Sequence, residues 1–326
     1  MTVETIQYET FDSFLNDVLP NGEIGRIFYG FDRFIFRGEP SNKYKLIPSA
    51  LREENIEYLH RAHSAPEQAR SEHLLLRKFF TIANNNGLKL PVSNDFRKYY
   101  LSSLFTDFAL QENTYNWLSG EYVEIAALAQ HYGVLTRLLD WTSDLFAAMY
   151  FASNGVFKKY IQNEYDCKDY MVIWALNSGS LQRPNVSGNL IPLKLVVPPY
   201  NDNENLNAQK GILSYWEIEL PCRKDEDDDI KQGKPALPTD RRPLDQLITE
   251  HDLTKKTVML YKFEIPVIEC LNMYTTLKFL GYTAAKLFPG YSGVARQMKE
   301  ENIIERLRCD KSICLSTTGC LDFWNK

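Results

Sequence analysis

A stretch near the middle of the chain, Gln130–Ser143, constrains the fold most, because it sets charged and hydroxyl side chains into an otherwise apolar run. The apolar residues 125–129 are expected to end a helix, which Gly133 can stop. Residues 134–141 have no helical stripe and are typical of a buried strand. The stretch therefore predicts a helix, a turn and a strand that carries charge into the core.

The two charged residues of this predicted strand need partners. Burying an unpaired charge costs several kcal/mol, so Arg137 and Asp140 are expected to pair with each other or to line a cleft. The ion pair is the preferred interpretation, because it would hold the strand and orient a site beside it. Direct contact with a ligand is the alternative. Thr142 or Ser143 follows and is expected to cap a helix over 144–154.

The composition is that of an ordinary globular protein. At 326 residues, with 44% hydrophobic and 13% aromatic residues, the chain can bury a large core and is too apolar to be disordered. The net charge of -5 gives no overall positive field, so nucleic acid could bind only in a local cleft. The six cysteines lack paired metal-ligand spacing, and we expect reduced packing thiols without a metal site.

The N-terminus and the hydropathy pattern predict a cytoplasmic protein. The first residues lack the basic and apolar regions of a signal peptide. No apolar run reaches the roughly 18–20 residues of a membrane span, so no membrane contact is expected.

Strand and helix patterns alternate along the chain and favour one elaborated α+β domain spanning all of it. A strand is expected at 31–38, and a mainly helical insertion at 67–130 separates it from the strand at 134–141. Residues 222–256 are acidic and rich in proline, which predicts a solvated surface insertion. Further strands are expected at 171–176, at 193–199 (a candidate edge strand, made less certain by its two prolines) and at 258–265, and further helices at 11–19, 267–280 and 293–307.

Four separated segments share their order and spacing with a known family. They are Phe36–Gly38, residues 130–142, Ala208–Gly211 and residues 287–293. Together they resemble the FRG domain, named after its Phe-Arg-Gly motif, over roughly residues 20–300. Members often have Gln-x-Gly-x-Phe-Thr in the third segment, whereas this chain has Leu213 and Ser214 in place of the last pair.

The layout of these segments also resembles, more remotely, that of ADP-ribosyltransferases. This resemblance implies a mixed, split β-sheet core with the helical insertion between its first two strands. In that fold a first-strand arginine grips a dinucleotide, a second-strand hydroxyl shapes the nicotinamide pocket, and a third-strand acid contacts the nicotinamide ribose. The resemblance therefore implies a protein that binds NAD as substrate. Such a protein would either transfer ADP-ribose to an unknown macromolecular acceptor or hydrolyse NAD.

The resemblance assigns the phosphate end of NAD to Arg37. A planar guanidinium suits phosphate because it forms paired, charge-assisted hydrogen bonds, and Gly38 beside it adds backbone freedom. The alternative is that Arg37 only pairs with an acid such as Glu39 or Asp140.

The central stretch supplies the next candidates. His131 is expected to bind a ribose hydroxyl or to act as an acid–base group, since imidazole titrates near neutrality; a helix cap or a buried donor is the alternative. Trp141 is either a wall of the nicotinamide pocket or a core residue. Thr142 and Ser143 can line the pocket while they cap the helix, whose N-terminus favours phosphate.

The third segment offers Gln209 at the acid position. An amide stabilises an oxocarbenium ion less well than a carboxylate does, so this residue weakens the case for transferase chemistry. Glu217 and Glu219 share one face of the strand that follows, and Glu217 is the candidate replacement. Exposed strand carboxylates are the alternative interpretation.

A non-enzymatic module is the second hypothesis for function. The amide in the third segment favours a protein that senses a nucleotide or binds another protein without turnover. Either function would be consistent with a role in stress response or phage defence, as toxin-like chemistry on NAD suggests.

Overall fold

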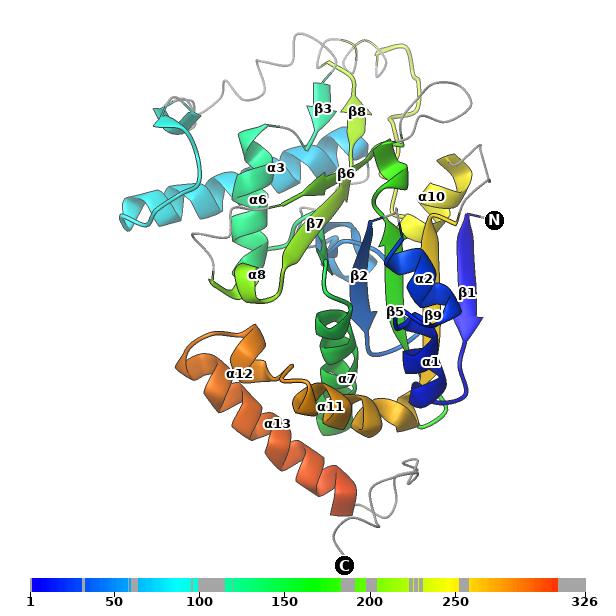
Figure 1. Cartoon of the computed structure of the whole chain (residues 1–326). Helices are drawn as coiled ribbons and strands as arrows, with labels where there is room; N and C mark the ends of the chain where they lie inside the picture. The colour runs from blue at the N-terminus through cyan, green and yellow to red at the C-terminus, as the bar shows by residue number, and fades with distance from the viewer. Residues whose placement is uncertain are drawn as a thin grey trace, which may run out of the picture.

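The computed structural model describes residues 2–30, 33–57, 59, 64–94, 96–98, 115–118, 120–182, 191–197, 204–222, 225, 228, 231–251 and 258–309. Within them, helices and strands are arranged around one mixed sheet, so the α+β class is confirmed (Figure 1). None of the helices in these ranges is long and apolar enough to cross a membrane.

Seven strands form the main sheet in the order β1-β9-β5-β2-β4-β7-β6. They are β1 (Val3–Gln7), β2 (Phe34–Glu39), β4 (Leu139–Thr142), β5 (Tyr170–Asn177), β6 (Leu193–Val196), β7 (Gly211–Trp216) and β9 (Leu260–Pro266). β1 pairs in parallel with β9, and the other neighbours are antiparallel. The predicted edge strand is confirmed as β6, whereas β1 at the opposite edge has no counterpart among the predicted strands.

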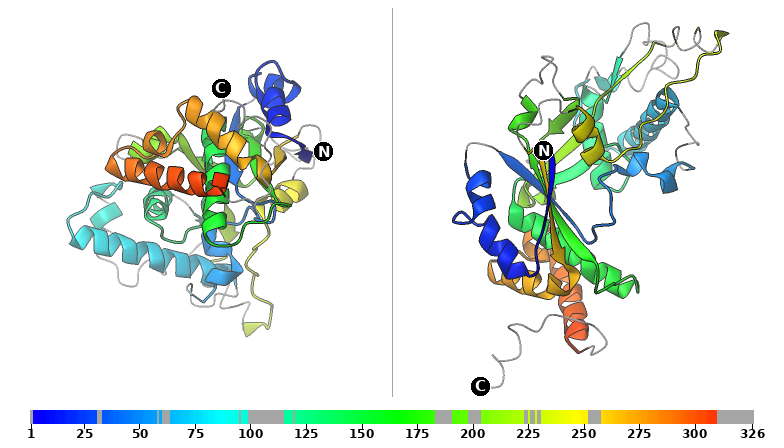
Figure 2. Two further views of the ribbon diagram at one scale, coloured as in Figure 1. Left: turned by 90° about the horizontal axis from the view of Figure 1, so that it is seen from below. Right: turned by 90° about the vertical axis from the view of Figure 1, so that its right-hand side faces the viewer.

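Helices cover one face of this sheet and bury its aromatic residues. β2 alternates, so Phe34 and Phe36 face the helices while Ile35 and Arg37 face the other way. The covering helices are α1 (Phe11–Val18), α2 (Glu23–Phe28), α7 (Leu145–Ile161) and α11 (Cys270–Phe279). Figure 2 shows α1 and α2 on one side of the sheet and α3 (Ala65–Asn85) on the other.

The opposite face carries a second core that includes α10 (Leu244–His251). The sequence predicts a solvated insertion over 222–256, and this is wrong for α10. Leu244, Leu247 and Ile248 recur at helical spacing and are buried, Leu244 and Ile248 against the strands.

The helical insertion lies between β2 and β4, as predicted. After the 3-10 turns η1 (Ser49–Leu51) and η2 (Glu53–Asn55) it contains α3 and α6 (Glu121–His131). The turn after α6 matches the predicted helix stop, since Gly133 has a φ of 84°. Beside these helices, β3 (Tyr115–Trp117) and β8 (Ile218–Leu220) form a separate two-stranded sheet.

The described chain ends with α12 (Ala284–Leu287) and α13 (Tyr291–Cys309), the second of which confirms the predicted last helix. The Tyr150 hydroxyl of α7 donates to Glu300 at 2.7 Å and ties α13 to the core. The helix expected over 267–280 is a 3-10 turn, η5 (Val267–Glu269), followed by α11. The short elements η3 (Ser180–Gln182) and α8 (Glu204–Ala208) complete the order.

The central strand is shorter than predicted, and the sheet is split beside it. β4 begins at Leu139 because the residues before it bond elsewhere: the Thr136 carbonyl accepts the N–H of Ala50, and its own N–H donates to Ser49 Oγ. β4 pairs with β7 along its whole length, but it pairs with β2 only where Phe36 meets Thr142.

Candidate functional site

Three of the sequence segments join at the start of α7. The Thr142 hydroxyl donates to the carbonyl of Gln209 at 2.6 Å, and the Gln209 amide donates to the carbonyl of Leu287 at 3.0 Å. The backbone N–H of the exposed Ser143 donates to the carbonyl of Lys210 at 3.1 Å. Thr142 and Gln209 therefore use their polar groups to hold these segments together.

Asp144 caps α7, so the prediction of Thr142 or Ser143 as the cap is wrong. Its carboxylate accepts the first N–H groups of the helix at 3.0 and 3.4 Å, while the Thr142 hydroxyl is turned to the neighbouring segment. Lys210 Nζ and the Tyr282 hydroxyl also donate to this carboxylate, at 2.8 and 2.9 Å. Burial and the hydrogen bond to Asp144 raise the pKa of Tyr282 to about 12. The helix terminus is thus occupied by the protein's own groups.

Arg37 bridges the split between β2 and β4. Its Nε and Nη2 both lie 2.7 Å from Glu39 Oε1, and its Nη1 donates to the backbone carbonyl of Asp140 at 2.8 Å, in place of a strand-to-strand bond. Arg37 therefore pairs with Glu39, one of the two acids named from the sequence, and the carboxylate of the other, Asp140, lies farther away, at 3.8 Å. Burial alone would lower the pKa of Arg37, but the two acids raise it. Gly38 lets the backbone approach α7, because a Cβ there would lie 1.9 Å from the carbonyl oxygen of Ala148.

His131 lies near Asp140, the residue of β4 whose carbonyl accepts the hydrogen bond from Arg37. The Asp140 side chain is 68% exposed, and its Oδ1 accepts the Gln130 amide at 2.7 Å. Partial burial lowers the pKa of His131, although nearby Asp140 raises it. The imidazole packs edge-on against Tyr132, with the ring centres 5.1 Å apart. This end of β4 is polar and open to solvent.

Arg137 does not pair with Asp140, which corrects the sequence prediction. It forms a bidentate salt bridge with Glu72 of α3, in which its Nε donates to Oε2 at 2.6 Å and its Nη2 to Oε1 at 2.9 Å. Both side chains are 4% exposed. The Trp117 indole and the Gln68 amide donate to the same carboxylate at 2.8 and 2.9 Å. Arg137 lies before β4, in the segment that leads into it, and its side chain enters the interior, whereas the side chain of Asp140, within β4, faces solvent.

Trp141 is a core residue, one of the two predicted alternatives. Its ring is buried on the sheet face opposite α7, and its indole N–H donates to Ser214 Oγ at 2.8 Å.

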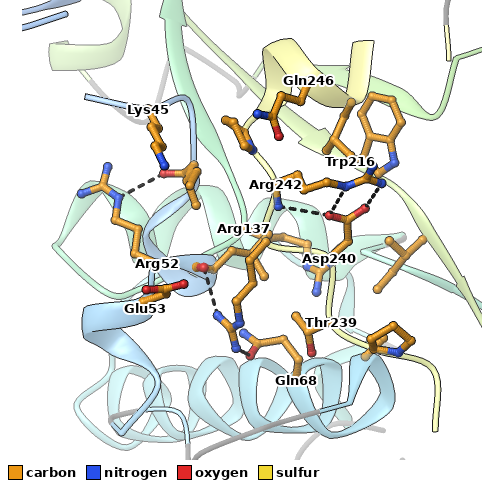
Figure 3. A pocket seen from close by; sticks show the side chains of 18 of the residues that line it. Lys45, Arg52, Glu53, Gln68, Arg137, Trp216, Thr239, Asp240, Arg242 and Gln246 are labelled. Carbon is orange, nitrogen blue, oxygen red and sulfur yellow. Dashed lines mark hydrogen bonds and ion pairs between the residues drawn. The ribbon is translucent and has the colours of Figure 1, made fainter. Parts of the chain in front are cut away.

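An open cleft of about 1330 Å³ lies between the loop at 43–54, the start of α3, the β7–β8 connection and the segment 237–247 (Figure 3). This volume is larger than the roughly 300–1,000 Å³ of most ligand pockets. Among the predicted site residues, Arg137 and Glu217 line it, and so does Glu39, the partner of Arg37. The lining residues do not include Arg37 itself, His131 or Gln209.

Positive and negative side chains are balanced in this cleft. The cations are Lys43, Lys45, Arg52, Arg137, Arg241 and Arg242, and the carboxylates are Glu39, Glu53, Glu54, Glu217, Glu219 and Asp240. Such a lining suits a ligand that itself carries charges of both signs.

A buried hydrogen-bond network forms the floor of the cleft. Arg241 donates to the Leu51 carbonyl at 2.9 Å and to Gln68 Oε1 at 3.0 Å, and Gln68 in turn donates to Glu72. Burial lowers the pKa of Arg241, while Glu72 and Glu53 raise it. The floor therefore holds the cationic groups of Arg137 and Arg241 around one buried carboxylate.

Apart from Arg137, the sequence prediction does not include the residues of this floor, although the sequence carries a signal for Glu72. The buried stripe of α3 runs through Ala69, Glu72, Leu76 and Phe80 at helical spacing, so a glutamate stands at a core position. A buried acid requires a cation from elsewhere in the chain. No comparable local signal marks Arg241.

Comparison with known proteins finds one match. Residues 32–160, from β2 through nearly all of α7, match the family model of the FRG domain. Neither a curated protein nor a solved structure matches the chain. Among the described residues, no three His, Cys, Asp or Glu side chains are gathered in a way that could hold a metal ion.

Proposed function

We propose that this chain, which carries an FRG domain over residues 32–160, binds NAD in the open cleft and breaks its bond to nicotinamide, as an ADP-ribosyltransferase or an NAD glycohydrolase. The observation that carries the proposal is a carboxylate, Glu39, that lines the cleft and is held in place by Arg37.

Glu39 has one oxygen fixed and one available. Both donors of Arg37 contact Oε1, and Oε2 has no hydrogen bond or ion pair within the residues that the structure describes. A carboxylate in this state can accept a ribose hydroxyl of NAD and stabilise the positive charge that develops on the ribose ring. Arg37 would then be a positioning residue for this acid, rather than the group that grips phosphate.

Glu217 offers a second carboxylate in the same cleft. It lies 3.5 Å from Lys194 and is only partly exposed. Glu39 is the better candidate because its two-donor contact with a nearly buried arginine fixes its position more firmly, and a fixed group costs less reorganisation during the reaction.

The chemistry needs no further reactant besides water or an acceptor. The bond between ribose C1 and the nicotinamide nitrogen breaks, and nicotinamide leaves as a neutral molecule with the bonding electron pair. Water or an acceptor nucleophile then bonds to C1 and loses a proton to solvent or to a cleft carboxylate. The cationic base and the anionic phosphates of NAD match the mixed charge of the lining.

The test is nicotinamide release from NAD by the full chain at high protein concentration. We expect release by the wild type and a loss of about 100-fold or more in Glu39→Gln, the scale expected for removing one electrostatic stabiliser. Glu305→Gln, on the exposed surface of α13, is the matched control and should keep full activity. Release that persists in Glu39→Gln but disappears in Glu217→Gln would move the role to Glu217. Absence of both release and NAD binding in the wild type would refute the proposal.

A nucleotide-sensing module without turnover is the second candidate. The position of Gln209 favours it, since the third-segment amide is committed to the Leu287 carbonyl and contributes no acid. Under this function, NAD or a related nucleotide would raise the melting temperature of the protein and no product would form.

A further inference from the structure

One wall of the cleft combines an aromatic ring with an amide. Trp216, at the end of β7, is half-buried and rests edge-on against His251 of α10, with the ring centres 5.0 Å apart at 63°. Gln246, on the same helix, is exposed and lines the cleft beside it (Figure 3). His251 braces the indole, so Trp216 is a firm platform on which a planar base can stack.

A glutamine amide is a group that can distinguish between purine bases. A glutamine amide donates and accepts at once, which matches the N6 donor and N7 acceptor of adenine, whereas guanine presents two acceptors that prefer arginine. Arg242 is the arginine on this wall, and it is already committed. Asp240 binds its Nε and Nη2 at 2.9 and 2.6 Å, and Glu250 binds its Nη1. Gln246 is therefore the group left to read a base.

The opposite wall carries two cationic side chains, Lys45 and Arg52, beside the carboxylates Glu53 and Glu54. Lys45 is exposed, and Arg52 donates its Nε to the Ile47 carbonyl at 3.1 Å. Within the described part of the chain, neither side chain forms an ion pair with a carboxylate, in contrast to Lys43, which lies 2.5 Å from Asp169. In Figure 3, Lys45 and Arg52 lie across the cleft from Trp216 and Gln246.

We propose that the cleft selects an adenine nucleotide, with the base stacked on Trp216 and read by Gln246, and with the phosphates held by Lys45 and Arg52. The inference rests on the proposed function only in placing the ligand in this cleft. It does not require that NAD is cleaved.

The test compares ADP with GDP by calorimetric titration of the full chain. We expect the wild type to bind ADP at least about tenfold more tightly than GDP, and Gln246→Ala to bring the two affinities together. Trp216→Leu and Arg52→Gln should each weaken ADP binding by about tenfold or more. Phe279→Ala and Arg26→Gln, an exposed aromatic and an exposed arginine away from the cleft, are the matched controls and should bind like the wild type.

The outcomes separate this inference from the proposed function. ADP binding with these variant effects, in a protein that releases no nicotinamide, supports the inference while the enzymatic function fails. Equal affinity of the wild type for ADP and GDP overturns the inference even if NAD is cleaved. Unchanged ADP binding in both Trp216→Leu and Gln246→Ala overturns it as well. Gln246 is exposed, so its variant tests the base site without disturbing the fold.

Discussion

Gly38 stands where the backbone of α7 lies directly against β2. A Cβ at this position would lie 1.9 Å from the Ala148 carbonyl oxygen and 2.8 Å from the Ala152 nitrogen, and neither backbone atom can move aside. We expect Gly38→Ala to lower the free energy of unfolding by about 3 kcal/mol or more, at the upper end of overpacking effects. Urea denaturation of the wild type and the variant measures this change in the free energy of unfolding. Gly30→Ala, where the nearest atom is at 3.1 Å on the surface, should cost less than about 1 kcal/mol, and equal effects would contradict this account.

Individual residues show how far local sequence can predict a site. The pairing of Arg37 with Glu39 was predictable, because residues two apart on a strand share a face. The partner of Arg137 was not, because Glu72 is 65 positions away and only tertiary folding brings the two together. The sequence pattern marks both as buried charges in need of a partner, and it leaves the identity of that partner open.

At the level of elements, the Glu72–Arg137 pair joins α3 to the segment that leads into β4. Arg137→Met leaves Glu72 buried without its cation, and we expect a loss of about 3–5 kcal/mol in the free energy of unfolding. The double variant Arg137→Met/Glu72→Gln should recover roughly 1–3 kcal/mol, because a neutral amide can still accept from Trp117.

Denaturation of the two single variants and the double variant, with Arg26→Met as a surface control, measures this coupling. Strictly additive losses would mean that the pair contributes nothing as a pair. The control arginine is exposed, so its removal should change stability by less than about 0.5 kcal/mol.

Elements with a strong periodic pattern were predictable, and those that depend on distant pairing were not. The strand at 171–176 is apolar and buried, the strand at 258–265 alternates buried and partly buried residues, and both predictions are confirmed, as β5 and β9 inside the sheet. β1 is five residues long and depends on pairing with β9, more than 250 positions later, so its own sequence carries little signal. α10 was obscured by the charged residues around it, although its three buried aliphatic side chains keep helical spacing.

At the scale of the whole molecule, the cleft is assembled from parts of the chain that are far apart in sequence. The loop at 43–54 forms one side, and β7, β8 and α10 together form the other. If an adenine nucleotide bridges these sides, ADP should slow amide hydrogen exchange in residues 45–53 and in α10 together, and leave α13 unchanged. Exchange measured by mass spectrometry, with and without ADP, tests this. Protection of α13 equal to that of α10 would indicate a general stabilisation or another binding site.

This assembly explains why the cleft was not predictable as a unit. The motif segments of the sequence gather at the start of α7 and in the split beside β4, where they hold the fold together. Most of the cleft lining lies outside these segments. Arg137 and Glu39 are the places where the two regions meet.

The half-buried position of Trp216 also gives the cleft an optical reporter. The chain has five tryptophans; Trp117, Trp141 and Trp174 are buried, and Trp324 lies outside the described residues. Trp216 is the indole that lines the cleft, so a stacked base would quench its emission while the buried indoles keep theirs. Arrival and departure of a nucleotide can then be timed by intrinsic fluorescence, without attaching a dye to either molecule.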